Sequence, residues 1–287
     1  ILALLLVVIA LVVVSAERSV RGFVTQSSSE PSPLEPISRP VRMVVMLLVS
    51  LPPLIGVVVP LVGLGIRLAN AQTLREIDGT RLIVATSMTV GVSLAAAVVA
   101  LVLALPIAAL AARYSTRWAG ALEGLGYLSH GLPGIVVGLS LVFFSLQVVP
   151  ALYQSVMVLV FAYAVLFMPK ALGTARASIE AVSPDLVSVA RTLGSSPLSA
   201  WRRVTLPLAL PGLGIGALLV AIATMKELPA TLLLRPIGAN TLATELWTRT
   251  AAGEFGAAAP YAALLVLVAA IPAMILSGVR PGVKEAL

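Results

Sequence analysis

The stretch SVARTLGSSPLSAWRRVTLP, residues 188–207, interrupts a strongly apolar chain and decides how the rest of the sequence is interpreted. It carries three arginines and contains Gly194 and Pro197, so a lipid bilayer would not accept it as a span. Long apolar stretches lie on both sides. The segment is therefore expected outside the membrane, between two spanning helices.

The composition is that of a polytopic membrane protein. Of the 287 residues, 59% are hydrophobic and 11% are charged. Basic cytoplasmic loops account for the net charge of +7, so we expect no nucleic-acid partner. The chain has no cysteine and only one histidine, His130, which excludes thiolate and multi-histidine metal sites. We expect no catalytic residue, and no metal or cofactor bound by this chain.

Seven stretches are candidates for membrane spans, each of which needs about 20 mostly apolar residues. They are residues 1–16, 43–66, 82–112, 121–147, 154–173, 208–228 and 257–279. The fold class is therefore all-α, with six spans plus one preceding span. The six spans are numbered from 43–66, so that 121–147 is the third and 208–228 is the fifth. We interpret 1–16 as the last span of a preceding membrane unit, 17–42 as a cytoplasmic linker rich in serine and proline, and 43–280 as the six-span unit.

The positions of the lysines and arginines predict the orientation. If the linker is cytoplasmic, 13 of the 19 basic residues lie inside, and six lie outside: Arg67, Arg75, Arg81, Lys226, Arg235 and Arg249. This puts residues 188–207 in the cytoplasm, and the chain in the cell inner membrane. A short outer loop carries Arg75, Glu76, Asp78 and Arg81; contact with a binding protein and simple solvation are equally good interpretations.

The polar segment itself is predicted to form two short helices. Ser183 is a suitable N-cap, Pro184 suits the first helical position, and Asp185 complements the positive helix end. Leu186, Val189, Ala190 and Leu193 form an apolar stripe, Gly194 would end the helix in a left-handed conformation, and Ser196 with Pro197 can begin a second helix. Such a hairpin could lie on lipid headgroups or dock to a cytoplasmic partner.

The spacing within this segment resembles the EAA loop of binding-protein-dependent ABC transporter permeases. That pattern has Glu-Ala-Ala, three residues, Gly, nine residues, then Ile, any residue and Leu-Pro. Here Ser188-Val189-Ala190, Gly194, Val204 and Leu206-Pro207 occupy these positions. Ser188, Val189 and Val204 depart from the pattern, and Ser188 removes one polar contact that the glutamate would make.

The resemblance covers residues 80–280, a type I transmembrane domain, and implies that the loop 175–207 inserts into a cytoplasmic ABC ATPase dimer. The coupling residues that it implies are Asp185, Ser188, Val189, Ala190, Arg191, Gly194, Pro197, Trp201, Arg202, Arg203, Leu206 and Pro207. It also implies a solute-binding protein and a second permease half, from the same longer chain or another copy. ATP and magnesium would bind the partner ATPase, since this chain has no GxxxxGK[ST] motif.

Two further stretches are similar to iron(III)-type fused permeases, of which this chain resembles the C-terminal half. They are Met225–Trp247 and the run Ser129-His130-Gly131-Leu132-Pro133-Gly134. The resemblance implies iron(III) as the solute, although thiamine, phosphonate and polyamine permeases share much of the pattern.

Other residues and functions leave alternatives open. Lys226 and Glu227 follow the fifth span, and are either a candidate outer gate or interfacial anchors. Gly212 and Gly216 are spaced for close helix packing. The alternatives to the ATP-driven permease are a secondary transporter driven by an ion gradient and a structural membrane subunit. A secondary transporter usually has ionisable residues at mid-span, and the sequence shows none clearly there.

Overall fold

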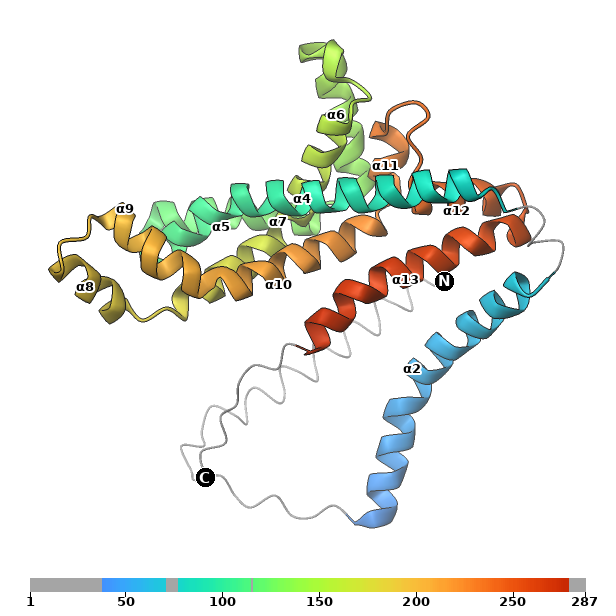
Figure 1. The fold of residues 1–287 in the computed structure, drawn as a ribbon, viewed down its shortest axis with the longest axis horizontal. Helices are drawn as coiled ribbons and strands as arrows, with labels where there is room; N and C mark the ends of the chain where they lie inside the picture. The colour runs from blue at the N-terminus through green and yellow to red at the C-terminus, as the bar shows by residue number, and fades with distance from the viewer. Residues whose placement is uncertain (1–37, 71–76, 115, 279–287) are drawn as a thin grey trace. The chain divides into compact units, whose positions relative to one another are not determined.

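The computed structural model describes residues 38–70, 77–114 and 116–278, which form helices and no strand (Figure 1). The predictions for 1–16, for most of the linker 17–42, and for Arg75 and Glu76 lie outside the described residues. The chain divides into two units at Val58, and all contacts discussed below lie within the unit that starts at Val59.

The described helices follow one another with short connections. They are α2 (Arg39–Leu68), α4 (Gly79–Arg113), α5 (Arg117–Tyr127), η1 (Leu128–Gly131), α6 (Gly134–Val148), η2 (Pro150–Leu152), α7 (Val156–Glu180), α8 (Pro184–Thr192), α9 (Pro197–Ala200), η3 (Trp201–Thr205), α10 (Leu206–Met225), α11 (Pro229–Leu234), α12 (Leu242–Ala251) and α13 (Phe255–Gly278). Within the described ranges, five helices are long and apolar enough to span a membrane. A sixth span results if a bent pair counts as one. The all-α, multi-span fold class is confirmed.

The third predicted span, 121–147, is not one straight helix. The helix axis bends by 107° between the segments Arg117–Gly131 and Gly134–Val148. Pro133 explains the break, because it has no backbone N–H and holds Leu132 before it in an extended conformation, with φ −95° and ψ 127°.

Three long helices, α4, α7 and α10, run side by side and form the main core (Figure 1). The contact face of α4 consists of small residues: Ala97, Ala100, Ala104 and Ala108 are all buried. Lipid is as apolar as leucine, so spanning helices associate through close packing rather than through the hydrophobic effect. Small side chains on α4 therefore allow the backbones of α7 and α10 to approach.

The α7–α10 contact depends on two glycines in the same way. A Cβ atom at Gly212 would overlap the Ser178 hydroxyl, and one at Gly216 would overlap the Thr174 hydroxyl. Both hydroxyls are already engaged with the backbone of α7: Ser178 Oγ donates to the Thr174 carbonyl at 2.6 Å. The predicted close packing of Gly212 and Gly216 against another helix is confirmed.

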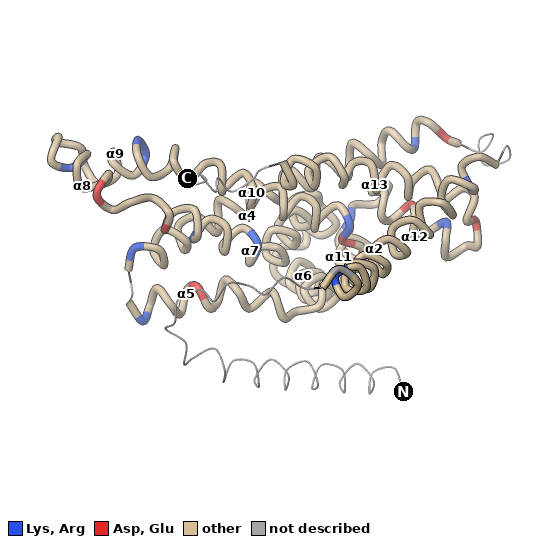
Figure 2. The backbone as a smooth tube through the Cα atoms, turned by 90° about the horizontal axis from the view of Figure 1, so that it is seen from below, with Lys and Arg blue, Asp and Glu red and all other residues tan. Residues whose placement is uncertain are grey.

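Charged residues of this unit gather mainly at its two ends. Figure 2 shows blue and red segments around α8 and α9 at one end and around α12 at the other, separated by tan helices. Blue and red also meet in the middle, beside α11. That central position is unusual for charged residues in spanning segments, which are costly unless they are paired or face water.

The α7–α10 contact gives a testable expectation for stability. Gly212→Ala should lower the free energy of unfolding by about 1–3 kcal/mol, because the new methyl group overlaps Ser178. Gly214→Ala is the matched control in the same helix, since a Cβ there has no atom within 4 Å. Thermal unfolding of the detergent-purified protein measures both. Equal stability of the two variants would contradict the proposed close contact.

Candidate functional site

The segment between α7 and α10 begins with the predicted helix. Ser183 is the N-cap of α8, and its Oγ accepts a hydrogen bond from the backbone N–H of Asp185 at 3.2 Å. Pro184 lies in the first turn together with Asp185, whose charge complements the positive end of the helix. These local predictions are confirmed.

The end of α8 is a left-handed turn at Gly194, as predicted. Gly194 has φ +87°, and its N–H donates to the carbonyl of Arg191 at 3.0 Å. The N–H of Ser195 reaches back to the carbonyl of Ala190, also at 3.0 Å. This pair of bonds is the Schellman motif, which satisfies carbonyls that the helix end leaves free. Gly194 thus reverses the chain so that α9 can start at Pro197.

The fifth span starts earlier than the predicted 208–228. α9, η3 and α10 form one helix from Pro197 to Met225, in which η3 is a π-helical turn. The N–H of Leu206 bonds to the carbonyl of Trp201, which widens the turn just before Pro207. Because proline lacks an N–H and its ring crowds the preceding turn of an α-helix, the wider turn accommodates it. Pro207 therefore lies inside a continuous helix.

The apolar stripe of α8 has no partner within the described chain. None of the residues of α8 is buried; Leu186, Val189 and Leu193 are exposed, and Leu193 is 81% exposed. Leu198 in α9 is 67% exposed. Figure 1 shows α8 and α9 beyond the ends of α4, α7 and α10. An amphipathic helix with an uncovered apolar face is typical of an element that binds something outside the chain.

The remaining predicted coupling residues surround this stripe. Ser188, at the glutamate position of the EAA pattern, donates its hydroxyl to the carbonyl of Pro184 at 3.0 Å. Trp201 is half-buried. The side chains of Arg191, Arg202 and Arg203 are exposed, which places positive charge on the same end of the protein. The structure thus brings the predicted coupling residues together at one end.

Two arginines attach this end of the protein to the core helices. From the sequence alone, they are only two of the 13 basic residues expected on the cytoplasmic side. Arg113, the last residue of α4, donates from Nη2 to the carbonyl of Ile179 at 3.2 Å and to that of Val182 at 3.0 Å. Arg176 in α7 forms ion pairs with Glu123 of α5 and with Glu180, the latter at 2.7 Å. These bonds connect α4, α5 and the exit of α7. Apart from the i,i+4 pair Arg176–Glu180, only the folded arrangement reveals these contacts, since their partners are 53 to 69 residues apart.

Lys226 and Glu227 lie elsewhere, at a break between α10 and α11. Residues on either side of this break contact α7, and these contacts show where along α7 the break lies. Gly216 packs against Thr174, and the hydroxyls of Thr231 and Tyr163 are 2.5 Å apart. The break between Gly216 and Thr231 therefore lies beside the middle of α7, whose ends are Val156 and Glu180.

Lys226 and Glu227 directly follow the last residue of the helix Pro197–Met225, as expected from the sequence, and lie beside the middle of α7 rather than beside its end. The carboxylate of Glu227 accepts a hydrogen bond from the N–H of Ala230 at 3.1 Å, and a Cβ at Gly134 would be 2.5 Å from its Oε1. Glu227 therefore joins the break in the fifth span to the bend in the third.

Apolar helices with breaks that lie against each other, as at Pro133 and Glu227, are typical of membrane transport proteins. The family described as binding-protein-dependent transport system inner membrane component matches residues 104–281, and the chain belongs to this family. It is a family of multi-pass membrane permeases, which are not themselves enzymes. The resemblance proposed from the EAA spacing is confirmed.

Individual relatives have different solutes in their names. The chain is 41% identical over 173 residues to an Fe(3+)-transport system permease protein, FbpB 2, of Haemophilus influenzae, covering 60% of this chain and 34% of that protein. It is 29% identical to the putative 2-aminoethylphosphonate permease PhnV of Salmonella typhimurium, covering 59% and 63%. It is also 29% identical to the molybdenum permease ModB of Mycobacterium tuberculosis, covering 78% and 90%. The chain thus spans about a third of the iron permease and under two thirds of PhnV.

Solved structures agree on the fold. A bacterial alginate ABC transporter, in complex with an alginate-bound periplasmic protein, matches with a TM-score of 0.64 at 17% identity. The match covers 83% of this chain and 92% of that chain. The methionine transporter MetNI in an inward-facing conformation matches with a TM-score of 0.55 at 18% identity, covering 68% and 93%. At these identities the likeness shows the fold alone.

The attachment of α8 by Arg113 can be tested directly. Arg113→Gln removes two hydrogen bonds to the exit of α7, so amides of residues 181–196 should exchange with solvent about tenfold faster. Arg117→Gln is the control, because Arg117 is exposed and lies near the same end of the chain. Hydrogen exchange followed by mass spectrometry measures both variants. Unchanged protection in Arg113→Gln would show that the arginine does not hold the segment.

Proposed function

We propose that this chain is the membrane-spanning subunit of an ATP-driven importer in the cell inner membrane, and that α8 and α9 dock to a separate ATPase dimer. The observation that carries the proposal is the uncovered stripe Leu186, Val189 and Leu193 on a segment that is firmly attached to two spans. Burying one leucine side chain contributes about 1.5–3 kcal/mol, so three such residues can anchor an interface. The absence of a GxxxxGK[ST] motif in the sequence agrees with an ATPase on another polypeptide.

The attachment of the segment suggests how motion would pass to the spans. α9 continues into α10 without a break, while Arg113 ties the exit of α7 to the end of α4. A displacement of α8 and α9 would therefore move the ends of three core helices together. Coupling between two sites requires such an element, whose arrangement both sites can bias. The exposed Arg191, Arg202 and Arg203 would add charge complementarity to an acidic groove on the ATPase.

Iron(III) is the solute that we propose, delivered by a solute-binding protein and carried between this chain and a second permease half. The iron permease of H. influenzae, at 41% identity, supports iron over the phosphonate and molybdenum relatives at 29%. The second candidate function is an ion-driven secondary transporter, which the central position of Lys226 and Glu227 favours. In both cases the membrane lipid surrounds the spans, and the chain itself holds no cofactor.

We further propose that the junction of the two broken spans forms a gate in the pathway. Glu227 caps the start of α11, lies against Gly134 at the start of α6, and is only half-buried. Irregular backbone at membrane depth is tolerated where it is enclosed by protein or lines a water-filled cavity. Lys226 is exposed next to it, so charged groups are available to a passing solute or to the second half.

The docking proposal predicts the effect of one exposed leucine. Leu193→Ser in the full-length permease should abolish co-purification of its ATPase and reduce ATP-dependent iron(III) uptake at least about tenfold, because the stripe loses an anchor. Pull-down in detergent and uptake of radioactive iron into proteoliposomes, with the binding protein present, measure the two effects.

The control is Ile237→Ser, an equally apolar and exposed position, 91% exposed, in the loop between α11 and α12. It should leave ATPase binding unchanged. If Leu193→Ser retains the ATPase, the docking surface is wrong. If uptake proceeds without ATP and follows an imposed ion gradient, the secondary transporter replaces the ATP-driven permease.

The gate proposal predicts a loss of transport without a loss of ATPase binding. In Gly134→Ala, the new Cβ would be 2.5 Å from Glu227 Oε1, so the carboxylate must move, and uptake should fall at least about fivefold. Glu227→Gln should also reduce uptake, since it removes the charge. Gly131→Ala is the control, because a Cβ there has no neighbour within 4 Å. Normal uptake by both Gly134→Ala and Glu227→Gln would exclude the gate.

A further inference from the structure

A second polar site lies at the end of the unit opposite to α8, where the start of α4, the loop after α11, and α12 come together. These elements line an open cavity of about 570 Å³. Its charged lining residues are Arg81, Arg235, Arg249, Glu245 and Glu254. Three arginines against two glutamates leave the lining with one excess positive charge. Neither the coupling segment nor the gate includes any of these residues.

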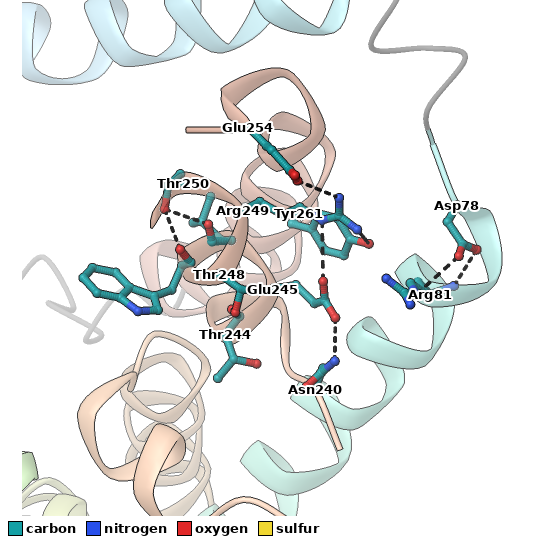
Figure 3. A network of polar contacts seen from close by, with 12 residues as sticks. Asp78, Arg81, Asn240, Thr244, Glu245, Thr248, Arg249, Thr250, Glu254 and Tyr261 are labelled. Carbon is teal, nitrogen blue, oxygen red and sulfur yellow. Dashed lines mark hydrogen bonds and ion pairs between the residues drawn. The ribbon is translucent and has the colours of Figure 1, made fainter. Parts of the chain in front are cut away.

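Arg249 lines this cavity and is held by several long contacts. Its guanidinium lies over the ring of Tyr261, 4.9 Å from the centroid, and its side chain is 18% exposed. Its Nη2 donates a hydrogen bond to the Tyr261 hydroxyl at 3.3 Å. Its Nε lies 3.5 Å from Glu245 Oε2, and its Nη1 lies 3.7 Å from Glu254 Oε2. Figure 3 shows these side chains grouped around α12. The Nε–H therefore faces Glu245 at a distance too long for a good hydrogen bond and is only partly satisfied.

The negative charge of Glu245 is already balanced within the fold. Its Oε1 accepts a hydrogen bond from Asn240 Nδ2 at 2.6 Å, and its side chain is 10% exposed. Glu245 also lies in the first turn of α12, where the helix end is positive. Glu245 is thus stabilised by Asn240, Arg249 and the helix, so it neutralises only part of the arginine charge.

Arg235 and Arg81 carry positive charge that remains available at the cavity. Arg235 donates to Asn240 Oδ1, and within the described residues it forms no ion pair. Arg81 pairs with Asp78 at 3.5 Å, but both side chains are about half exposed or more, at 65% and 48%. An exposed pair of this kind contributes little, so Arg81 can exchange its partner. Figure 3 shows Arg81 across the space from Glu245 and Arg249.

We propose that this cavity binds an oxyanion of the phosphate type. Arg235 and Arg81 would hold the anion by direct hydrogen bonds, and the guanidinium charge of Arg249 would add to the attraction. Guanidinium groups match the geometry of phosphate oxygens and form charge-assisted, paired hydrogen bonds with them. Free phosphate and the phosphate of a lipid headgroup share this chemistry, and the site would accept either. The proposal does not depend on which solute crosses the membrane.

Titration calorimetry of the full-length permease in detergent tests the site, with inorganic phosphate as the probe at constant ionic strength. Wild type should bind phosphate, and Arg235→Gln should bind it about tenfold more weakly. Arg235→Lys should recover part of the loss, because it keeps the charge. Arg117→Gln, an exposed arginine at the opposite end, is the control and should bind as wild type does.

A variant that is expected to bind phosphate more tightly distinguishes an effect at the site from misfolding. Glu254→Gln removes a negative charge from the lining and should strengthen phosphate binding, a result that damage to the fold cannot produce. Competition by added phosphatidylglycerol would identify a headgroup as the source, and its absence would identify free phosphate; both support the site. Absence of phosphate binding by wild type, or equal binding by wild type and Arg235→Gln, would overturn it. Neither of these results would affect ATPase docking.

Discussion

The close approach of α7 and α10 is the contact on which the rest of the structure depends. Gly212 and Gly216 leave room for the hydroxyls of Ser178 and Thr174, and the alanine face of α4 completes the packing. Between spanning helices the hydrophobic effect is weak, so such backbone proximity is the main source of cohesion. Because α8 connects the ends of α7 and α9, the geometry of this helix pair also fixes where the amphipathic segment stands.

The helices depart from regular geometry where neighbouring groups can form hydrogen bonds with the freed backbone groups. The π turn before Pro207 uses an i to i−5 bond, and the break at Glu227 uses its own carboxylate as a cap for Ala230. In a membrane each unsatisfied backbone group costs several kcal/mol, so irregular segments are confined to protein-covered positions. The bend at Pro133 and the break at Glu227 lie against each other, with the Glu227 carboxylate beside Gly134.

Local signals in the sequence predicted local structure well. Signals that act within a few residues can be recognised without knowledge of the fold. They include Ser183 and Pro184 at one helix start, Gly194 at a helix end, and the glycine spacing in α10. The bend angle of the third span and the position of Glu227 beside the middle of α7 could not be predicted from the sequence, because they depend on contacts with α7. Arg113, Arg235 and Arg249 were visible only as charges, since their partners are set by helix packing.

The two ends of the protein differ in how charge is handled, and this difference bears on their roles. At the α8 end, the arginines of η3 are exposed and the apolar stripe is uncovered, an arrangement in which both kinds of group remain free to meet a partner. At the α12 end, Arg249 and Glu245 are enclosed and Asn240 connects Glu245 to Arg235. An enclosed network has a fixed geometry, which suits selection of a small anion, whereas an exposed amphipathic segment suits a large protein surface. α4 runs unbroken from Arg81 at the cavity to Arg113 at the α8 end, so an event at either end can reach the other through this helix as well as through the α7–α10 pair.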